Sequence, residues 1–267
     1  MTLSYELPEV VPYINWAYYY HAWQVKQSDE RRRLREEAEA FLVAQQERYH
    51  THAVLMIAQA YADGDDIVLS IDGTETTFPC LRQQHGQTCR CLADFIAPQR
   101  CAPSVDNQIG LFATSTDAGM EHDFDADPYL KMMAQLLADR LAEATAERLH
   151  EQVRKQLWGY APNEQLSIGE MQQEHFHGIR PAVGYPSLPD ASLNFLLDRL
   201  LDMRQIGITL TESGAMRPHA SVSGLMIAHP SACYFGVGKI GHDQLSDYAR
   251  RRGLSLETMQ KFLSANL

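Results

Sequence analysis

The chain has 267 residues, of which 45% are hydrophobic and 21% charged, and it carries a net charge of −11. These numbers are typical of one large globular domain or two small ones, and the acidic charge disfavours non-specific binding to nucleic acid or anionic lipid. The sequence has no apolar run of about 18 residues and no signal region at its start, so we expect a cytoplasmic protein without a membrane segment.

The first half of the chain predicts helices and strands in alternation. Residues 1–26 are rich in aromatic side chains, which we expect to pack against a neighbouring element. The segment 28–49 predicts a charged helix whose cap is Ser28 or Asp29. Apolar runs at 53–61 and 66–71 flank an Asp-Gly turn and predict a β-hairpin. Residues 109–115 predict a further strand.

The longest helix signal covers residues 123–160. Asp127 fits the N-cap and Pro128 the first helical position. Apolar residues three or four apart predict one buried face, made by Met133, Leu137, Leu141 and Ala144. Gly159 and Pro162 are expected to end this helix.

An irregular segment follows at residues 180–190, "RPAVGYPSLPD", which we call the proline arch. Three prolines in eleven residues exclude a helix or a central strand. After it we predict a short helix at 192–203, a hairpin formed by 221–229 and 233–240, and two C-terminal helices. This mixed order favours an α+β fold, and the lack of a linker favours one domain.

Three motifs imitate known sites. Only one close pair, C-x-C, occurs in the cysteine cluster, so reduced thiols are favoured over zinc for Cys80, Cys89, Cys91 and Cys101. "GVGKIG" at 236–241 matches a dinucleotide-binding motif, but the 26 residues after it are too few to complete that fold. "DFDADP" at 123–128 lacks the glycine and glutamate of a calcium loop and is interpreted as an acidic loop before the helix.

Polar residues also recur along one face of the long helix, namely Asp139, Glu143, Glu147 and His150. Paired carboxylates can act as general acid and base, but a solvated helix face is the favoured interpretation. Solvated helix ends are likewise favoured for the two basic runs, residues 250–252 and Arg154 with Lys155.

The proline arch carries the residues best suited to ligand binding. An arginine on a rigid segment, Arg180, can bind a carboxylate through two parallel hydrogen bonds. Tyr185 offers a π face to a cation or a ring. The ligand predicted is small, zwitterionic or cationic, and partly aromatic. The alternative is that Arg180 only holds the loop in place.

Long motifs in the chain resemble the activation domain of cobalamin-dependent methionine synthase. The match is carried by residues 137–164, 178–190, 210–240 and 247–253, with looser matches at "YINWAYYYHAW" and "LADFIAP". The resemblance implies a single C-shaped α+β domain over residues 1–267, including the aromatic segment 1–26. It also implies a bent antiparallel sheet flanked by helices.

The function implied by the resemblance is reactivation of an oxidised cobalamin. The family's domain binds S-adenosylmethionine in a shallow groove, a flavodoxin-like donor supplies one electron to cob(II)alamin, and the methyl group of S-adenosylmethionine regenerates methylcobalamin. No D-x-H-x-x-G cobalamin loop occurs in this sequence. The cobalamin is therefore expected on a separate or missing module, and this chain alone would not make methionine.

The resemblance also assigns roles to residues of this chain. Arg180 would hold the ligand's carboxylate, and the backbone at Ala182 and Gly184 would meet its adenine or ribose. Tyr185 and Tyr234 would flank the ligand near the sulfonium. No general base or metal ligand is expected, because positioning of the methyl group is the main task.

Three further residues complete the expected site. Glu143 would balance the positive charge of the ligand, and Asp139 would face the cobalamin module. Asn15 stands where the family commonly has an aspartate, so one negative charge is missing. This departure supports one alternative, a module of the same fold that has drifted to docking or sensing. A further alternative, a structural partner that only clamps a cobalamin domain, needs no ligand at all.

Overall fold

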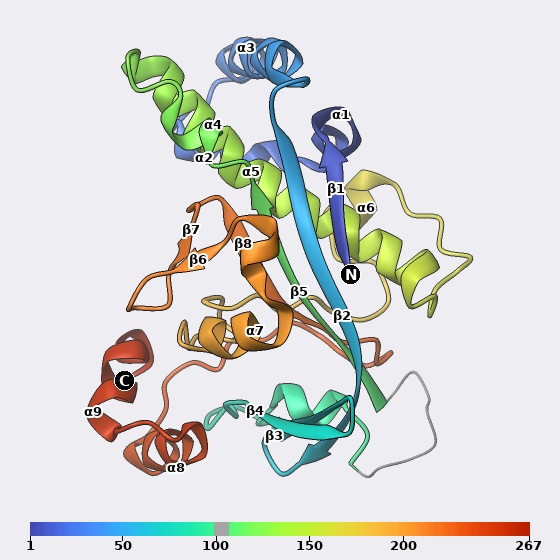
Figure 1. Cartoon of the computed structure of the whole chain (residues 1–267), viewed down its shortest axis with the longest axis vertical. Coiled ribbons are helices and arrows are strands. Elements are labelled where there is room, and N and C mark those ends of the chain that lie inside the picture. Colours follow the sequence, from blue (N-terminus) through green and yellow to red (C-terminus); the bar gives the residue numbers. More distant parts are fainter. Residues whose placement is uncertain (99–106) are drawn as a thin grey trace.

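A bent, six-stranded antiparallel sheet forms the frame of the protein (Figure 1). The computed structural model describes residues 1–98 and 107–267. The strand order is β4-β3-β2-β5-β8, with β1 added at the edge of β2. The strands are β1 (Thr2–Glu6), β2 (His50–Asp63), β3 (Asp66–Ile71), β4 (Thr74–Pro79), β5 (Gln108–Thr116) and β8 (Ser221–Met226). The predicted α+β class and the predicted hairpin of β2 and β3 are confirmed.

Both faces of the sheet are covered by apolar side chains. Because successive strand residues point to opposite faces, Leu55, Phe112 and Met226 join one hydrophobic cluster. Their sequence neighbours Val54, Leu111 and Leu225 join a second cluster on the other face. β2 is 14 residues long and contributes to both clusters, so it links the two halves of the molecule.

Helices enclose the sheet from two sides (Figure 1). One group lies with the N-terminal strand: α1 (Leu7–Val10), α2 (Trp16–Ala22), α3 (Ser28–Gln45), α4 (Gly119–His122), α5 (Pro128–Gln152) and α6 (Ile168–Gln172). The other group lies toward β3 and β4: α7 (Leu193–Leu201), α8 (His242–Arg252) and α9 (Leu256–Phe262). A small ribbon of β6 (Thr209–Leu210) and β7 (Met216–Arg217) stands apart. None of the helices described is long and apolar enough to cross a bilayer.

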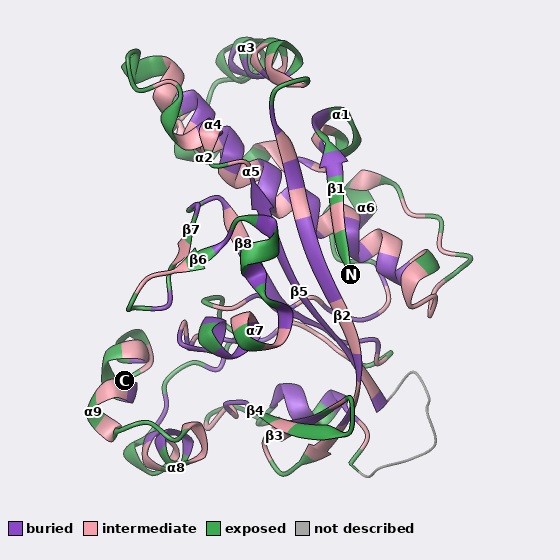
Figure 2. Cartoon of the chain, viewed as in Figure 1, coloured by how far each residue is buried: buried purple, intermediate pink, exposed green. Residues whose placement is uncertain are grey.

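The long helix α5 forms as the sequence predicts. The Asp127 side chain accepts hydrogen bonds from the amides of Tyr129 and Leu130, at 2.9 and 3.1 Å, and Pro128 opens the helix. A buried stripe runs along α5 in Figure 2 and includes the four apolar residues predicted for it, Met133, Leu137, Leu141 and Ala144. One π-helical turn, Val153–Leu157, ends the element before Gly159, whose φ is +76°.

Two local predictions for the N-terminal part need correction. The N-cap of α3 is Gln27, without a side-chain cap, and Ser28 is already helical. Among the N-terminal aromatic residues, Tyr19 is fully buried, as predicted, but Tyr18 is 62% exposed.

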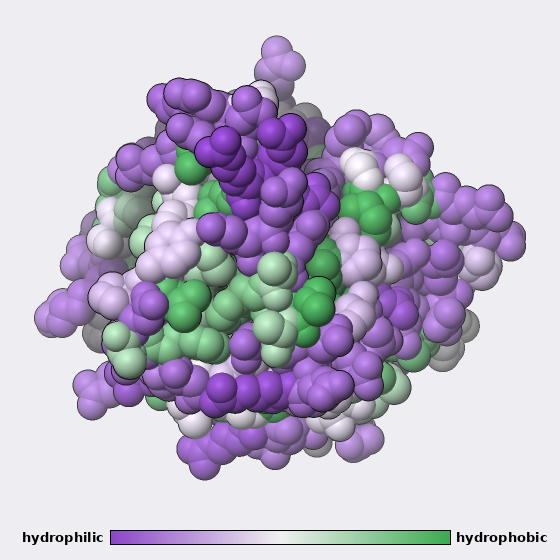
Figure 3. Space-filling model, turned by 90° about the horizontal axis from the view of Figure 1, so that it is seen from above, coloured by the Kyte–Doolittle hydropathy of each residue, from purple (hydrophilic) through white to green (hydrophobic). Residues whose placement is uncertain are grey.

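The surface seen from above is not uniformly hydrophilic. Hydrophobic residues gather there between hydrophilic regions (Figure 3).

The predicted hairpin of 221–229 and 233–240 is wrong, because another segment already occupies the edge of β8. The start of the proline arch pairs there: the Val183 amide donates to Ser223 O at 2.8 Å and the Leu225 amide to Pro181 O at 3.0 Å. The approach requires glycine in the strand, since a Cβ on Gly224 would lie 2.2 Å from Pro181 O. Residues 233–240 instead run along the outer side of the arch, where the Val237 amide donates to Pro186 O.

The basic runs are largely buried rather than solvated. Arg154 is fully buried, donates to Glu164 through Nε and Nη2 at 2.7 to 3.0 Å, and lies 4.5 Å from the Phe176 ring centroid. Arg251 pairs with acids of β3 and α8, and the 8%-exposed Arg252 pairs with a buried aspartate of the arch. Only Arg250 of the C-terminal run is largely exposed, at 74%.

The cysteines form no cluster with metal-ligand geometry within the described ranges. Cys80 and Cys91 are buried, Cys89 is exposed, and all three are free thiols. Cys101 lies outside the described residues. Residues 1–98 and 107–267 contain no group of three potential metal ligands. "GVGKIG" is followed by α8 and α9, so the βαβ unit of a dinucleotide-binding fold is not formed.

The buried Arg154–Glu164 pair predicts a large loss of stability on substitution. Glu164→Gln leaves a buried guanidinium without its counter-charge, so we expect the free energy of unfolding to fall by about 3 to 5 kcal/mol in urea denaturation. The control is Glu257→Gln, which breaks the exposed pair with Lys261 and should cost less than about 1 kcal/mol. Equal losses in the two variants would contradict this account.

Candidate ligand-binding site

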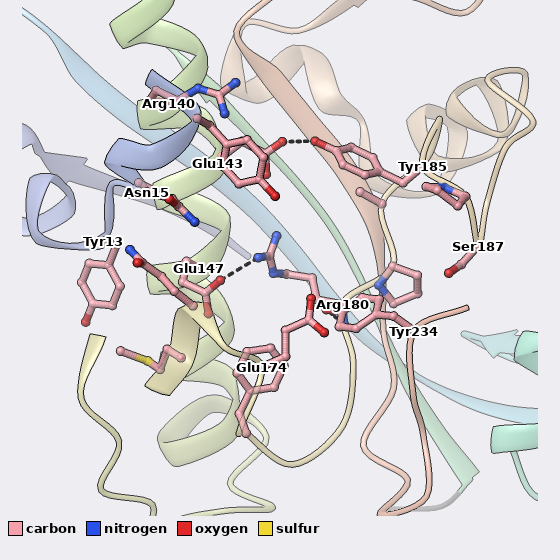
Figure 4. A pocket seen from close by; sticks show the side chains of 18 of the residues that line it. Tyr13, Asn15, Arg140, Glu143, Glu147, Glu174, Arg180, Tyr185, Ser187 and Tyr234 are labelled. Carbon is pink, nitrogen blue, oxygen red and sulfur yellow. Dashed lines mark hydrogen bonds and ion pairs between the residues drawn. The ribbon is translucent and has the colours of Figure 1, made fainter. Parts of the chain in front are cut away.

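A cleft of about 710 Å³ lies between α5 and the proline arch. Its walls also include residues from the turn before α2, the loop after α6 and the segment 234–236. Figure 4 shows charged and aromatic side chains from these five segments pointing into one space. The volume is in the range that holds a small ligand or cofactor.

Arg180 is fixed at the centre of the cleft. Its Nη2 donates to Glu147 Oε2 at 2.9 Å, and its backbone amide donates to the Tyr234 hydroxyl at 2.9 Å. The side chain is 11% exposed, and its Nε has no partner among the described residues. Burial opposes the charge, but the neighbouring Glu147, Tyr234 and Glu143 together raise the pKa of Arg180. Arg180 therefore stays cationic and keeps an unused donor.

Glu143 and Tyr185 face each other across the cleft (Figure 4). The Tyr185 hydroxyl donates a hydrogen bond to Glu143 Oε1. Burial raises the pKa of Tyr185, and the charge of Glu143 raises it further, so the phenol is a donor at neutral pH. The Tyr185 residue is 50% exposed, so its ring is accessible from solvent.

Asn15 lines the same cleft and caps α2. Its Oδ1 accepts a hydrogen bond from the Ala17 amide at 3.2 Å. Aspartate caps helices as well as asparagine does. The residue at position 15 can therefore change the charge of the cleft without loss of the helix cap.

The charged groups of the cleft leave an excess of one negative charge. Three carboxylates, Glu143, Glu147 and Glu174, face two guanidiniums, Arg140 and Arg180. Only one of these carboxylates, Glu147, is ion-paired with one of the guanidiniums within the described residues. A ligand with one net positive charge would complement this arrangement electrostatically.

Most residues predicted from the sequence meet in this cleft. Its lining includes six of them, Asn15, Glu143, Arg180, Ala182, Tyr185 and Tyr234. Gly184 does not line it. With φ of +89°, Gly184 shapes a turn of the arch, and its amide donates to Leu188 O at 2.7 Å.

Asp139 lies on α5 outside the cleft. Its Oδ1 is 3.3 Å from Nδ1 of His219, a residue that is itself 87% exposed at the side chain. Burial raises the pKa of Asp139, and His219 acts in the opposite direction. A docking contact by Asp139 remains a prediction.

Several cleft residues were not anticipated as site residues. The prediction of a solvated helix face is wrong for two residues: Glu147 lines the cleft and pairs with Arg180, and His150, behind the cleft wall, is fully buried. Tyr13, Arg140 and Glu174 line the cleft without any local motif. The one sequence signal for Glu147 is its spacing, four residues after Glu143, which places both side chains on the same face of the helix.

Comparisons with known proteins agree with this geometry. A family model described as the activation domain of vitamin B12-dependent methionine synthase matches residues 6–253. Among solved structures, the crystal structure of the MetH reactivation domain bound to AdoHcy is similar, with a TM-score of 0.92 and 36% sequence identity. The match covers 100% of this chain and 90% of that chain.

His150 supports the cleft wall and predicts an acid-sensitive stability. It packs edge-on against Phe176 at 4.9 Å, and its Nε2 lies 3.2 Å from the Tyr160 hydroxyl. Burial lowers the pKa of His150 well below its usual range, and Arg154 and Arg180 lower it further. The imidazole of the unfolded chain takes up a proton near pH 6.5, whereas that of the folded chain does not. The free energy of unfolding therefore decreases as the pH is lowered below about 6.5.

We therefore expect His150 to contribute a loss of about 1 kcal/mol between pH 6.5 and 5.5. Urea denaturation at pH 5.5, 6.5 and 7.5, performed on the parent and His150→Gln, measures this difference in slope. The variant should be less stable at pH 7.5 and lose less on acidification. Parallel pH profiles would rule out the buried neutral imidazole as the cause.

Proposed function

The chain belongs to the family of activation domains of vitamin B12-dependent methionine synthase, and on that premise we propose that its cleft binds S-adenosylmethionine. The methyl group would be presented to a cobalamin carried by another module. The observation that carries the proposal is the cleft itself, with Arg180 fixed beside Tyr234 and Glu147 and with one excess negative charge. The neighbour's ligand, AdoHcy, is the product left when S-adenosylmethionine loses its methyl group.

Arg180 is suited to the carboxylate of the ligand. Its guanidinium is held by Glu147 on one side through Nη2, and the side chain lines the cleft. The backbone at Ala182 is already fixed by pairing of the arch with β8, so the ligand would meet a wall that loses little entropy on binding. We propose that Ala182 contacts the nucleoside part, and that Gly184 acts through the shape of the arch.

The aromatic and acidic residues suit the sulfonium. Tyr185 and Tyr234 offer electron-rich faces to a cation, an interaction worth about 0.5 to 2 kcal/mol each. Glu143 lies beside Tyr185 and supplies a full negative charge. S-adenosylmethionine carries one net positive charge and AdoHcy none, so the excess carboxylate favours the methylated form.

Catalysis would consist of positioning rather than proton transfer. The nucleophile that accepts the methyl group would come from the cobalamin of the other module, after its reduction by a flavodoxin-like donor. The cleft holds the sulfonium with its methyl group toward the open side, so that the two reactants meet in line. Asp139 and His219 lie outside the cleft on α5 and the neighbouring loop, and we propose that they face the docked cobalamin module.

We also propose that residues 1–267 work as one domain. The two hydrophobic clusters share β2, β5 and β8, and the cleft combines side chains from segments between positions 13 and 236.

Asn15→Asp tests the charge argument. The variant keeps the cap of α2 and adds one negative charge, so we expect S-adenosylmethionine to bind about 5- to 30-fold more tightly, or about 1 to 2 kcal/mol. Binding of AdoHcy should change much less. Isothermal titration calorimetry with both ligands measures the two changes, and thermal unfolding checks the fold. An equal gain for both ligands would contradict a role of position 15 in sensing the sulfonium.

Arg180→Lys tests the carboxylate contact. Lysine can keep the ion pair with Glu147 but loses the planar, two-pronged donor, so we expect at least a tenfold weaker affinity for S-adenosylmethionine with little change in stability. Arg32→Lys, on the exposed surface of α3, is the matched control. Unchanged affinity in Arg180→Lys would remove Arg180 from the site.

A further inference from the structure

A second cavity, of about 360 Å³, lies next to the ligand cleft, and Tyr13 lines both. Its walls come from α1, from the short 3-10 turn Val11–Tyr13, and from the end of α5 with the π-helical turn that follows. We infer that this cavity binds a small oxyanion, a phosphate or a carboxylate group, through Arg148. This site is separate from the cleft proposed for S-adenosylmethionine and does not depend on that proposal.

The end of α5 presents polar side chains to this cavity at helical spacing. Arg148, Gln152 and Lys155 are three or four residues apart and all line it, as expected for residues on one face of a helix. Lys155 and Gln156 belong to the π-helical turn Val153–Leu157. Such turns are rare and frequently occur at functional sites. The backbone is therefore unusual where two of the cavity's hydrogen-bond donors lie.

Arg148 is held by two aromatic rings and by no acid. Its guanidinium carbon lies 6.0 Å from the ring centroid of Tyr5 and 5.9 Å from that of Tyr13, which gives two cation–π contacts. Among the described residues, no hydrogen bond or ion pair reaches the guanidinium. The side chain is half-buried and lines the cavity. A planar fork of N–H donors is thus held in place and left free for an acceptor.

The two acids of the cavity are engaged elsewhere. Glu151 accepts from the Tyr13 hydroxyl through Oε2 and from Lys155 Nζ, at 3.2 Å, through Oε1. Burial acts to raise the pKa of Glu151, but Tyr13 and Lys155 outweigh it and lower the pKa. Glu9 is exposed, and its Oε2 accepts a backbone amide at 3.0 Å in the capping box of α1. Neither acid therefore occupies the donors of Arg148.

The side-chain amides of two glutamines add further donors. Gln152 Oε1 accepts from the Tyr5 hydroxyl at 2.9 Å, so its acceptor is already used. The NH2 groups of Gln152 and Gln156 donate no hydrogen bond to any residue that the structure describes. Together with Arg148, three side chains of the cavity thus have unused donors. An oxyanion, which only accepts hydrogen bonds and carries negative charge, complements this set.

The charges of the cavity predict which substitutions weaken and which strengthen anion binding. Lys155 and Glu151 neutralise each other as an ion pair, so Arg148 supplies the charge that attracts the anion. Glu9 is the one acid of the cavity without a cationic partner among the residues described, and it opposes the anion. Removal of Arg148 and removal of the Glu9 charge should therefore have opposite effects.

Titration with inorganic phosphate, and separately with acetate, tests the site on the whole chain. The arginine Nε–Hε and glutamine NH2 signals in ¹H–¹⁵N spectra are followed at pH 7.5. We expect saturable shifts of Arg148, Gln152 and Gln156 with a Kd of about 1 mM. Sodium chloride at the same ionic strength should not reproduce them. Tighter binding of phosphate assigns the site to a phosphate group and tighter binding of acetate to a carboxylate, and either result supports an oxyanion site.

Variants locate the anion. Arg148→Gln should weaken binding at least about tenfold, as for hydrogen bonds to charged groups. The matched control is Arg33→Gln on the exposed surface of α3, which should bind as the parent does. Glu9→Gln keeps the capping box and removes the opposing charge, so it should bind about two- to fivefold more tightly.

Absence of a saturable shift with both probes would overturn the site. So would a loss in Arg148→Gln no larger than that in Arg33→Gln. Arg148 also packs on two tyrosines, so thermal unfolding checks each variant. If Arg148→Gln does not fold, Glu9→Gln decides: unchanged or weaker binding in that variant would overturn the proposal. Binding of S-adenosylmethionine is not used in this test, so failure of the anion site and failure of the proposed function are told apart.

Discussion

The pairing of the proline arch with the edge of β8 is the constraint on which the cleft depends. Hydrogen bonds between Pro181, Val183 and the strand fix the backbone, and Gly224 makes the close approach possible. Arg180, between these contacts, then reaches α5 and pairs with Glu147. The cleft is therefore the space left between a long helix and an irregular segment that the sheet holds at a set distance.

The same constraint explains the electrostatics of the site. A segment that is fixed by its backbone can leave side-chain atoms unpaired, because its stability does not depend on them. Within the described residues, Arg180 Nε on the arch is such an atom, and Glu147 Oε1 on α5 is a second buried atom without a partner. Unsatisfied polar atoms in a buried place lower stability. Membership in the activation-domain family makes S-adenosylmethionine the ligand that best fits the cleft.

Local sequence signals predicted the parts of the fold that depend on local chemistry. The Asp127 cap, the Asp-Gly hairpin and the irregularity of the proline arch follow from residue types at fixed offsets, and all three are confirmed. The prediction of a hairpin over 221–240 is wrong because the partner of β8 is the start of the proline arch, where Ala182 bridges to Gly224. Long-range packing likewise buried Arg252, which pairs with Asp190 of the arch. Glu174 could not be assigned from its neighbours, since only the turn after α6 brings it beside Arg180.

The central claim is that the cleft between α5 and the proline arch holds S-adenosylmethionine through Arg180. A crystal structure of the protein with this ligand tests the claim most directly. The account predicts the ligand in the cleft, with its carboxylate on Arg180 and its sulfonium beside the side chains of Tyr185, Tyr234 and Glu143. A ligand bound elsewhere, or a cleft left empty at saturating concentration, would contradict it.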